Sequence, residues 1–288
     1  MITIFTPAYN RKDEIIKLYE SLTKQKKVKF EWVIVDDGST DGTDSVIDGF
    51  KNEGLIQIVY YKQENAGKNQ AHNKGVTLAK GEFFCCMDSD DWFTTDALEV
   101  IEKYIDIIRE NNDFCGLAFN SYKNDTKEII GKAFPENNFT SSYYDLYNKY
   151  GVTGDKQFVF KTDILKENLV DTVDGEKFIP EAVLLNRLSK KYKFYCINES
   201  IVHKRYLENG YSSNYFEIAK KNPKGNMLYY KELYYFDKSL YNVAAYNMYC
   251  MFAKIGFINT IKGHPSKLKS LIMYVPAYIK YKKKGGTQ

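Results

Sequence analysis

The sequence predicts an α/β protein, with a mostly parallel central sheet flanked by helices and a helical extension at its C-terminal end. Over the first 120 residues, short apolar runs alternate with segments whose apolar residues recur at helical spacing. Buried parallel strands have this continuous apolar character because helices cover both faces of their sheet. A length of 288 residues suits one large domain with an appendage.

Five apolar runs in this first part predict strands, and amphipathic segments between them predict helices. The strands are expected at 2–6, 30–35, 56–61, 82–87 and 114–119. Helices are expected after residue 10, toward residue 50, over 67–79 and over 98–108. We expect Asn10 to cap the first helix with Asp13 as its partner, and Ser39 or Thr40 to cap the second.

The rest of the chain shows weaker patterns. Residues 121–160 are polar, aromatic and irregular, and we expect them to form excursions from the sheet. Later elements are expected as a helix over 180–192, short strands over 194–197 and 201–203, and helices from about 226, broken at 263–265 and Pro276. We therefore predict two halves of one domain, 1–120 and 121–225, and a basic helical extension over 226–288.

Cysteine usage and the first residues both indicate a reducing compartment. The cysteines are Cys85, Cys86, Cys115, Cys196 and Cys250. They form no CxxC pair, so neither a zinc cluster nor a thiol nucleophile is expected, and the odd count of scattered thiols suggests a reducing compartment. The chain opens on a strand pattern, which predicts no secretory signal, and no apolar run approaches the length of a membrane span. We expect a cytoplasmic protein.

Positive charge is concentrated at the C-terminal end. After Asp237 the sequence has nine lysines and no acidic residue. Because the whole chain has a net charge of +4, the preceding residues carry a net charge of −5, which argues against nucleic-acid binding. Within 262–284, lysines interleave with aliphatic and aromatic residues. This segment could contact the anionic inner leaflet of the membrane; the alternative is a packed helix with a solvated lysine end.

An acidic group, Asp88-Ser89-Asp90-Asp91, follows the apolar run 83–87. Carboxylates this close repel one another, and a cation would relieve the repulsion. Oxygen ligands favour a hard divalent ion, Mg²⁺ or Mn²⁺, which usually serves a phosphate-bearing substrate. The alternative interpretation is a solvated acidic turn that caps the next helix.

Polar residues follow four of the predicted strands, at 6–10, 36–37, 65–68 and 88–91. Ligands of such sheets bind at the carboxyl ends of the strands, so these segments should converge. Tyr9 or Pro7 could stack on a uracil ring, Asp36 or Asp37 could accept its N–H, and Lys68 could contact a diphosphate. Ordinary packing, a turn with a helix cap and a solvated lysine are the respective alternatives. The glycine-rich motifs of dinucleotide folds and P-loop NTPases are absent.

These motifs together resemble those of family 2 glycosyltransferases of the bacterial surface-polysaccharide type. The matching segments are Pro7–Arg11, 30–43, 65–75, 79–82 and 88–91, in the family's order. The resemblance covers about residues 1–120. It implies a GT-A fold whose first half, 1–120, binds a nucleotide-sugar, most often a UDP-sugar, with Mn²⁺ or Mg²⁺. Residues 121–225 would then form the acceptor side.

The resemblance also implies roles for individual residues. Asp88 and Asp90 would form the DxD pair, with Asp90 on the metal and Asp88 on the metal or the ribose. Asp37 would bind the base beside Pro7 and Tyr9. Further donor contacts are expected from Thr6, Asp36, Lys68, Asn73 and Ser89. His203 is a candidate metal or phosphate ligand, although a lone histidine in a strand is more often structural.

Members of this kind invert the anomeric centre, using a base that takes the proton of the acceptor hydroxyl. The base usually lies in a Glu-Asp pair that opens a later helix, and here Glu181-Ala182 stands at that place. We expect Glu181 to be the base, with Glu176 and Asp155 as alternatives. The acceptor would be a glycan or a lipid-linked sugar. Because the usual Asp is missing at 182, a catalytically silent nucleotide-sugar-binding or scaffold subunit is the competing hypothesis.

Overall fold

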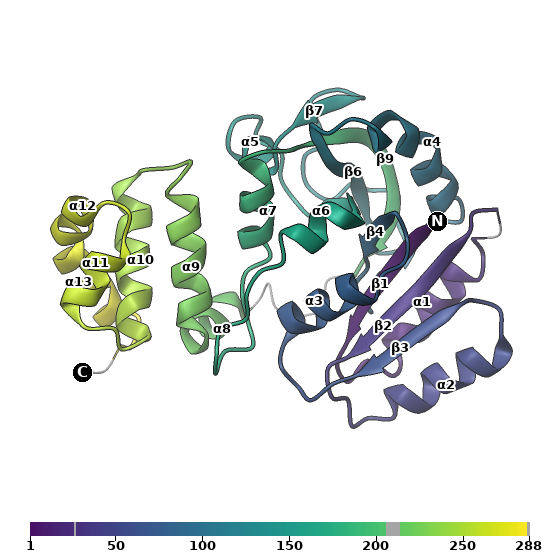
Figure 1. Cartoon of the computed structure of the whole chain (residues 1–288), viewed down its shortest axis with the longest axis horizontal. Helices are drawn as coiled ribbons and strands as arrows, with labels where there is room; N and C mark the ends of the chain where they lie inside the picture. Colours follow the sequence, from purple (N-terminus) through teal and green to yellow (C-terminus); the bar gives the residue numbers. More distant parts are fainter. Residues whose placement is uncertain (26, 206–213, 287–288) are drawn as a thin grey trace. The chain divides into compact units, whose positions relative to one another are not determined.

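The computed structural model describes residues 1–25, 27–205 and 214–286. The chain divides into two compact units, which are considered separately (Figure 1). The first unit comprises residues 1–169 and 188–206, and the second comprises 170–187 and 207–288. The first unit is therefore built from two separate stretches of the sequence. The predicted functional halves, 1–120 and 121–225, stay predictions.

The first unit contains a nine-stranded sheet of order β3-β2-β1-β4-β8-β6-β9-β5, with β7 pairing with β9. The strands are β1 (Ile2–Ala8), β2 (Phe30–Asp36), β3 (Ile58–Lys62), β4 (Phe83–Cys86), β5 (Trp92–Phe93), β6 (Phe114–Lys123), β7 (Phe139–Ser141), β8 (Gln157–Lys161) and β9 (Lys193–Lys204). Strands β3, β2, β1 and β4 are parallel, whereas β8 runs antiparallel to both β4 and β6. The predicted α/β class with a central sheet is confirmed.

Helices alternate with the strands of this unit. They are α1 (Glu14–Leu22), α2 (Thr43–Glu53), α3 (Lys68–Leu78), α4 (Ala97–Arg109), α5 (Tyr143–Asn148) and α6 (Thr162–Glu167), while α7 (Ala182–Ser189) contributes to both units. On α1, the residues Ile15, Leu18 and Leu22 recur at helical spacing and are fully buried in the same cluster as Trp32 of β2. Burial of each such aliphatic side chain stabilises the fold by about 2 kcal/mol.

Gly116 allows strands β6 and β8 to approach each other closely. A Cβ atom at Gly116 of β6 would lie 2.1 Å from the carbonyl oxygen of Val159 in β8. Any larger residue would push these two strands apart, so the antiparallel pairing of β6 and β8 depends on this glycine.

Several expected boundaries were wrong. Asn10 is not a helix cap, because α1 begins at Glu14 after Asp13, which makes no side-chain cap bond. Helix α2 begins at Thr43 after Gly42, so neither Ser39 nor Thr40 caps it. The two short strands expected after residue 193 are one strand, β9.

The predictions for two later segments also need correction. Residues 121–160 contain two strands and a helix, β7, β8 and α5, and are not only irregular excursions. Pro276 lies in the first turn of α13 (Tyr274–Lys283) and does not break a helix, because the first turn needs no N–H from that position. The expected break at 263–265 is confirmed, since α11 (Phe257–Gly263) ends there.

The second unit is helical, as predicted for the C-terminal extension. Its central helix is α10 (Leu240–Phe252), in which every residue from Asn242 to Met251 is buried. A helix buried on all sides needs neighbours on all sides. In Figure 1, α9 (Pro223–Leu233) lies on one side of α10, and α11, α12 (Lys267–Ile272) and α13 lie on the other. Helix α8 (Tyr215–Lys221) packs against α9 and α10.

Within the described residues, we find no helix with both the length and the apolar character required to cross a membrane.

Candidate functional site

The ends of three parallel strands meet at one edge of the sheet. Ala8 at the end of β1 pairs with Asp36 at the end of β2, and Phe5 pairs with Cys86 at the end of β4. Two backbone bonds continue these ladders past the strands, from Asp37 N to Ala8 O and from Met87 N to Phe5 O, both 2.8 Å long. The segments 8–10, 36–37 and 88–91 therefore begin side by side.

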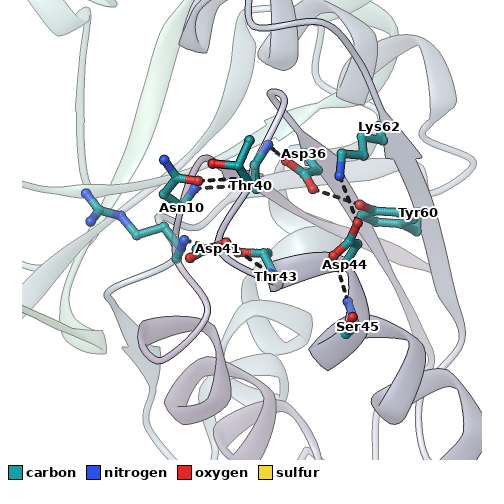
Figure 2. A network of polar contacts seen from close by, with 11 residues as sticks. Asn10, Asp36, Thr40, Asp41, Thr43, Asp44, Ser45, Tyr60 and Lys62 are labelled. Atoms are coloured by element: carbon teal, nitrogen blue, oxygen red, sulfur yellow. Dashed lines mark hydrogen bonds and ion pairs between the residues drawn. The ribbon is translucent and has the colours of Figure 1, made fainter.

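Asp36 lies at the centre of a polar network between β1, β2, β3 and α2 (Figure 2). Its carboxylate is fully buried and accepts hydrogen bonds from Ser39 N and from the Tyr60 hydroxyl, each at 2.7 Å. Burial and the Asp36 charge together raise the pKa of Tyr60 far above its usual value, so this tyrosine stays a donor. Both oxygens of Asp36 thus bind the protein itself.

Asp37 holds the loop that leads into α3. Its Oδ1 accepts bonds from Gln63 Nε2 at 2.7 Å and Ala66 N at 2.8 Å, and its Oδ2 accepts one from Gly67 N at 2.8 Å. Gly67 has φ +93°, a value that other residues rarely adopt, so the conformation of this loop favours glycine. A nucleobase N–H would have to use a lone pair of Asp37 that these donors leave.

The turn after β1 joins the Asp36 network. Asn10 adopts φ +52°, accepts a bond from Thr40 N through its side chain, and donates its N–H to Ser39 Oγ, both at 2.9 Å. The preceding Tyr9 is 50% exposed, so its ring is accessible beside these carboxylates. By contrast, Thr6 is fully buried and its hydroxyl accepts the Trp32 indole N–H at 3.0 Å, which fixes it in the core.

Lysines balance the charges of the acidic group at the end of β4. Lys68, the first residue of α3, places its Nζ 2.7 Å from Asp88 Oδ1. Burial would raise the pKa of Asp88, but Lys68 and Lys204 outweigh it and hold that pKa well below the usual value. Asp90 differs, because burial and the neighbouring charge of Asp88 raise its pKa. An added cation would therefore favour the charged form of Asp90.

Lys204 is a functional candidate that the sequence analysis missed. It ends β9, and its Nζ lies 3.2 Å from Asp91 Oδ2, while Arg205 N donates to Asp91 Oδ1 at 3.1 Å. Burial would lower the pKa of Lys204, but the charges of Asp91, Asp88 and Asp155 raise it above its usual value. Lys204 directly follows the strand expected over 201–203, but only the pairing of β9 with β5 shows that it lies near Asp91.

The three candidate bases lie in different units. Asp155 is exposed just before β8, in the first unit. Its charge, like that of Asp88, raises the pKa of Lys204. Glu176 and Glu181 belong to the second unit. Both oxygens of Glu176 accept backbone N–H groups of Lys224 and Gly225, at 2.8 Å, at the start of α9. Glu181 is exposed immediately before α7. The role of each as a base stays a prediction.

His203 lies among aromatic residues. Its ring stacks on Trp92 with centroids 5.5 Å apart, contacts Tyr122 on its other side, and places Nδ1 2.7 Å from the carbonyl oxygen of Asn124. Its role as a metal ligand stays a prediction. In the described residues, no group of three or more His, Cys, Asp or Glu side chains is arranged to hold a metal ion. The oxygen-only pair Asp88 and Asp90 nevertheless suits a hard cation that a bound phosphate would help to coordinate.

Comparison with known proteins agrees with this fold. The family model "Glycosyl transferase family 2" matches residues 3–169, more than half of the chain. The putative teichuronic acid biosynthesis glycosyltransferase TuaG of Bacillus subtilis is 28% identical over 77% of this chain and 85% of its own length. Staphylococcus aureus TarS, a poly(ribitol-phosphate) beta-N-acetylglucosaminyltransferase, is 28% identical over 58% of this chain but only 28% of its own length.

Solved structures share the fold at lower sequence identity. A TarS fragment in complex with UDP-GlcNAc has a TM-score of 0.63 and 16% identity, covering 98% of this chain and 91% of that one. The mannosyltransferase PcManGT of Pyrobaculum calidifontis, in complex with GDP-Man and Mn²⁺, has a TM-score of 0.57 and 16% identity, covering 98% and 83%. The fold and the family match define a GT-A glycosyltransferase. The chain belongs to glycosyl transferase family 2.

Proposed function

We propose that this protein transfers a sugar from a nucleotide-sugar, a UDP-sugar, to a hydroxyl group of a glycan or lipid-linked acceptor in the synthesis of a bacterial surface polysaccharide. The observation that carries the proposal is the meeting of Tyr9, Asp37 and the Asp88–Asp91 group at one sheet edge. TuaG and TarS, named for teichuronic acid synthesis and for poly(ribitol-phosphate), support the class of pathway. The UDP-GlcNAc complex of TarS supports the choice of nucleotide.

In this proposal, the residues of the edge divide the donor among them. Pro7 and Tyr9 contact the base, and Asp37 accepts from it while holding the loop 63–67 in place. Asp88 and Asp90 hold Mn²⁺ or Mg²⁺, which when bound would neutralise the diphosphate of the leaving group. Lys68 exchanges Asp88 for a diphosphate oxygen, and Thr6, Asp36, Asn73 and Ser89 support these contacts.

Transfer would proceed with inversion by a single displacement. A carboxylate takes the proton of the acceptor hydroxyl, the acceptor oxygen forms a bond to the anomeric carbon, and the bond from that carbon to the diphosphate oxygen breaks. Asp155 is the candidate base that the first unit supplies. Glu181 remains the candidate from the family pattern, whereas Glu176 already accepts two backbone bonds as a helix cap.

Release of the nucleotide from a panel of UDP-, GDP- and dTDP-sugars, with Mn²⁺, Mg²⁺ or EDTA, tests this function. We expect slow donor hydrolysis that requires a divalent ion and prefers a UDP-sugar. Binding of UDP without any release, with every acceptor and metal, would instead support the catalytically silent subunit that Ala182 suggests. Absence of nucleotide binding would contradict both.

A matched set of carboxylate variants identifies the base. Asp155→Asn, Glu181→Gln and Glu176→Gln keep the size of each side chain, and the base variant should lose transfer while its affinity for UDP is retained. Glu176→Gln should instead lower the stability of the second unit, because it weakens the cap of α9. If all three variants transferred sugar at the normal rate, the assignment of a carboxylate base from these positions would be wrong.

The unpaired state of the cysteine thiols supports a cytoplasmic location. No disulfide joins any of the five cysteines, all of which lie in the described part of the chain. Unbridged thiols suit the reducing cytoplasm, where we propose that the enzyme acts. A peripheral position on the inner face of the plasma membrane is a separate proposal.

A further inference from the structure

Helices α11, α12 and α13 expose most of their large apolar side chains to solvent. The residues that they bury are small or polar: Thr260, Ser270 and Ala277 are all fully buried. Ser270 Oγ donates to Asn247 Oδ1 of α10, and Asn247 Nδ2 donates to Ser270 O, both at 2.7 Å. Most of their large hydrophobic side chains are exposed instead: Phe257, Ile258, Leu268, Leu271, Ile272, Val275, Tyr278 and Ile279, whereas Tyr274 and Tyr281 pack against the buried cluster of this unit.

The exposed residues form a continuous stripe on each of two consecutive helices. On α12, Leu268, Leu271 and Ile272 follow the i, i+3, i+4 spacing that places side chains on one helix face. On α13, Val275, Tyr278 and Ile279 follow the same spacing, and Lys282 continues it. Leu268 and Val275 are 68% and 66% exposed, so these stripes do not pack on the rest of the unit. We refer to the eight exposed residues as the outer apolar face.

The charge around the outer apolar face has one sign. Lysines at 262, 267, 282, 283 and 284 are exposed on the same helices or at their ends. No acidic residue follows Asp237 in the sequence, so no carboxylate of this region balances them. The Nζ atoms of Lys280 and Lys284 lie 4.5 and 4.6 Å from the centres of the Tyr241 and Phe216 rings, respectively. The face therefore combines aliphatic groups with uncompensated positive charge.

The combination of exposed aliphatic groups and lysines indicates which kind of surface binds the outer apolar face. A second copy would bring a second set of lysines against the first, because a two-fold interface places the same patch on both partners. An anionic lipid surface has complementary charge, and its acyl chains accept aliphatic side chains. We propose that the outer apolar face of α11–α13 docks on an anionic membrane surface, with its lysines at the lipid headgroups.

The proposal predicts dependence on both charge and apolar contact. Each lysine near an anionic surface should strengthen binding about fivefold, an effect that salt screens. Exposed leucine, isoleucine and valine should add binding that salt does not remove. The docking does not require the sugar-transfer proposal, since none of these residues lies in the first unit.

Cosedimentation of the full chain with vesicles tests the docking. Vesicles of phosphatidylcholine with one-third phosphatidylglycerol should bind the protein, and vesicles of phosphatidylcholine alone should bind it much less. The variant Leu268→Gln/Leu271→Gln/Ile272→Gln should lose most of the binding that persists at high salt. Lys282→Gln/Lys283→Gln should weaken low-salt binding roughly 25-fold.

Leu55→Gln/Ile107→Gln is the matched control, because these residues are exposed aliphatics of the first unit. This variant, and Asp90→Asn, should sediment like the wild type. The helical circular dichroism signal of each variant checks that the fold is retained. We expect it to be retained, because all the substituted positions in these membrane-binding variants are exposed. Equal sedimentation of the wild type and the α12 variant would overturn the proposal, as would equal binding to neutral vesicles. Self-association in sedimentation velocity that the α12 variant abolishes would show instead that a second copy covers the face.

Discussion

The sheet edge holds two groups of aspartates by opposite means. Asp36 and Asp37 are almost fully buried, and N–H and O–H groups of the protein bind all four of their oxygens. In the Asp88–Asp91 group, the contacts of Asp88 and Asp91 include the flexible ammonium groups of Lys68 and Lys204. Backbone donors are fixed in direction, whereas a lysine side chain can move to another anion. Asp36 and Asp37 therefore act as framework, whereas Asp88 keeps a charge that a ligand can use.

The largest effect should come from Asp90→Asn, which removes a proposed cation ligand. Sugar transfer should fall roughly 100- to 1000-fold, the usual cost of losing one electrostatic contact to the transition state. The midpoint of urea unfolding should hardly change, because burial and Asp88 already disfavour the charge of Asp90. Initial rates and unfolding curves of the same preparation provide the two measurements. Normal transfer by this variant would remove Asp90 from the proposed metal site.

Lys204→Met should have the largest effect on stability. The change leaves Asp91 buried without its cation, at a cost of about 3 kcal/mol in the free energy of unfolding. Urea unfolding followed by tryptophan fluorescence measures it, since Trp92 pairs with the same strand. Lys103→Met is the matched control, because its ion pair with Glu199 is exposed and should contribute little to stability. Equal stability of the two variants would show that Asp91 does not need Lys204.

Asp37→Asn should lower the free energy of unfolding by about 2 kcal/mol, because an amide supplies one acceptor oxygen where the carboxylate binds three donors. Asp48→Asn, at an exposed ion pair with Lys51, is the control and should change stability by less than about 0.5 kcal/mol. Amide hydrogen exchange at Ala66 and Gly67 should accelerate in Asp37→Asn alone. Unchanged exchange at these amides would contradict the framework role.

Lys68→Gln should have the smallest effect on stability, under about 1 kcal/mol, because its pair with Asp88 is partly exposed. Affinity for UDP should fall by a larger factor, about tenfold, if Lys68 moves to the diphosphate. Isothermal titration with UDP at two salt concentrations measures this loss. If Lys68→Gln lowered the free energy of unfolding by more than it lowered the free energy of UDP binding, Lys68 would have a structural role like those of Asp36 and Asp37.

The sequence predicted those parts of the fold that depend on local patterns. The first four strands and α3 were found because apolar runs such as 30–35 and helical spacing are local signals. Asn10 was misassigned because its side chain bonds to Thr40, thirty residues away, which no local pattern indicates. The same limit applies to Pro276, whose first-turn position depends on where α13 begins.

At the site, sequence could identify the acidic residues but not their partners. Asp37 was expected to face a nucleobase, yet its donors come from a loop almost thirty residues later. Lys204 was missed because its effect depends on β9 lying in the sheet beside β5, a long-range pairing. The assignments of Glu181, Glu176, Asp155 and His203 remain untested for the same reason, since the role of each depends on substrate contacts.

The late arrival of β9 has a consequence for synthesis on the ribosome. Strands β5, β6 and β7 all pair with β9, which ends at Lys204. Because the chain emerges from its N-terminal end, these strands lack their partner until about two thirds of the protein has been made. During that interval the carboxylates of 88–91 also lack Lys204, and unpaired strand edges are exposed. A nascent chain from which β9 has not yet emerged should therefore depend on chaperones, while one that has emerged from the ribosome beyond β9 should already be able to complete the sheet.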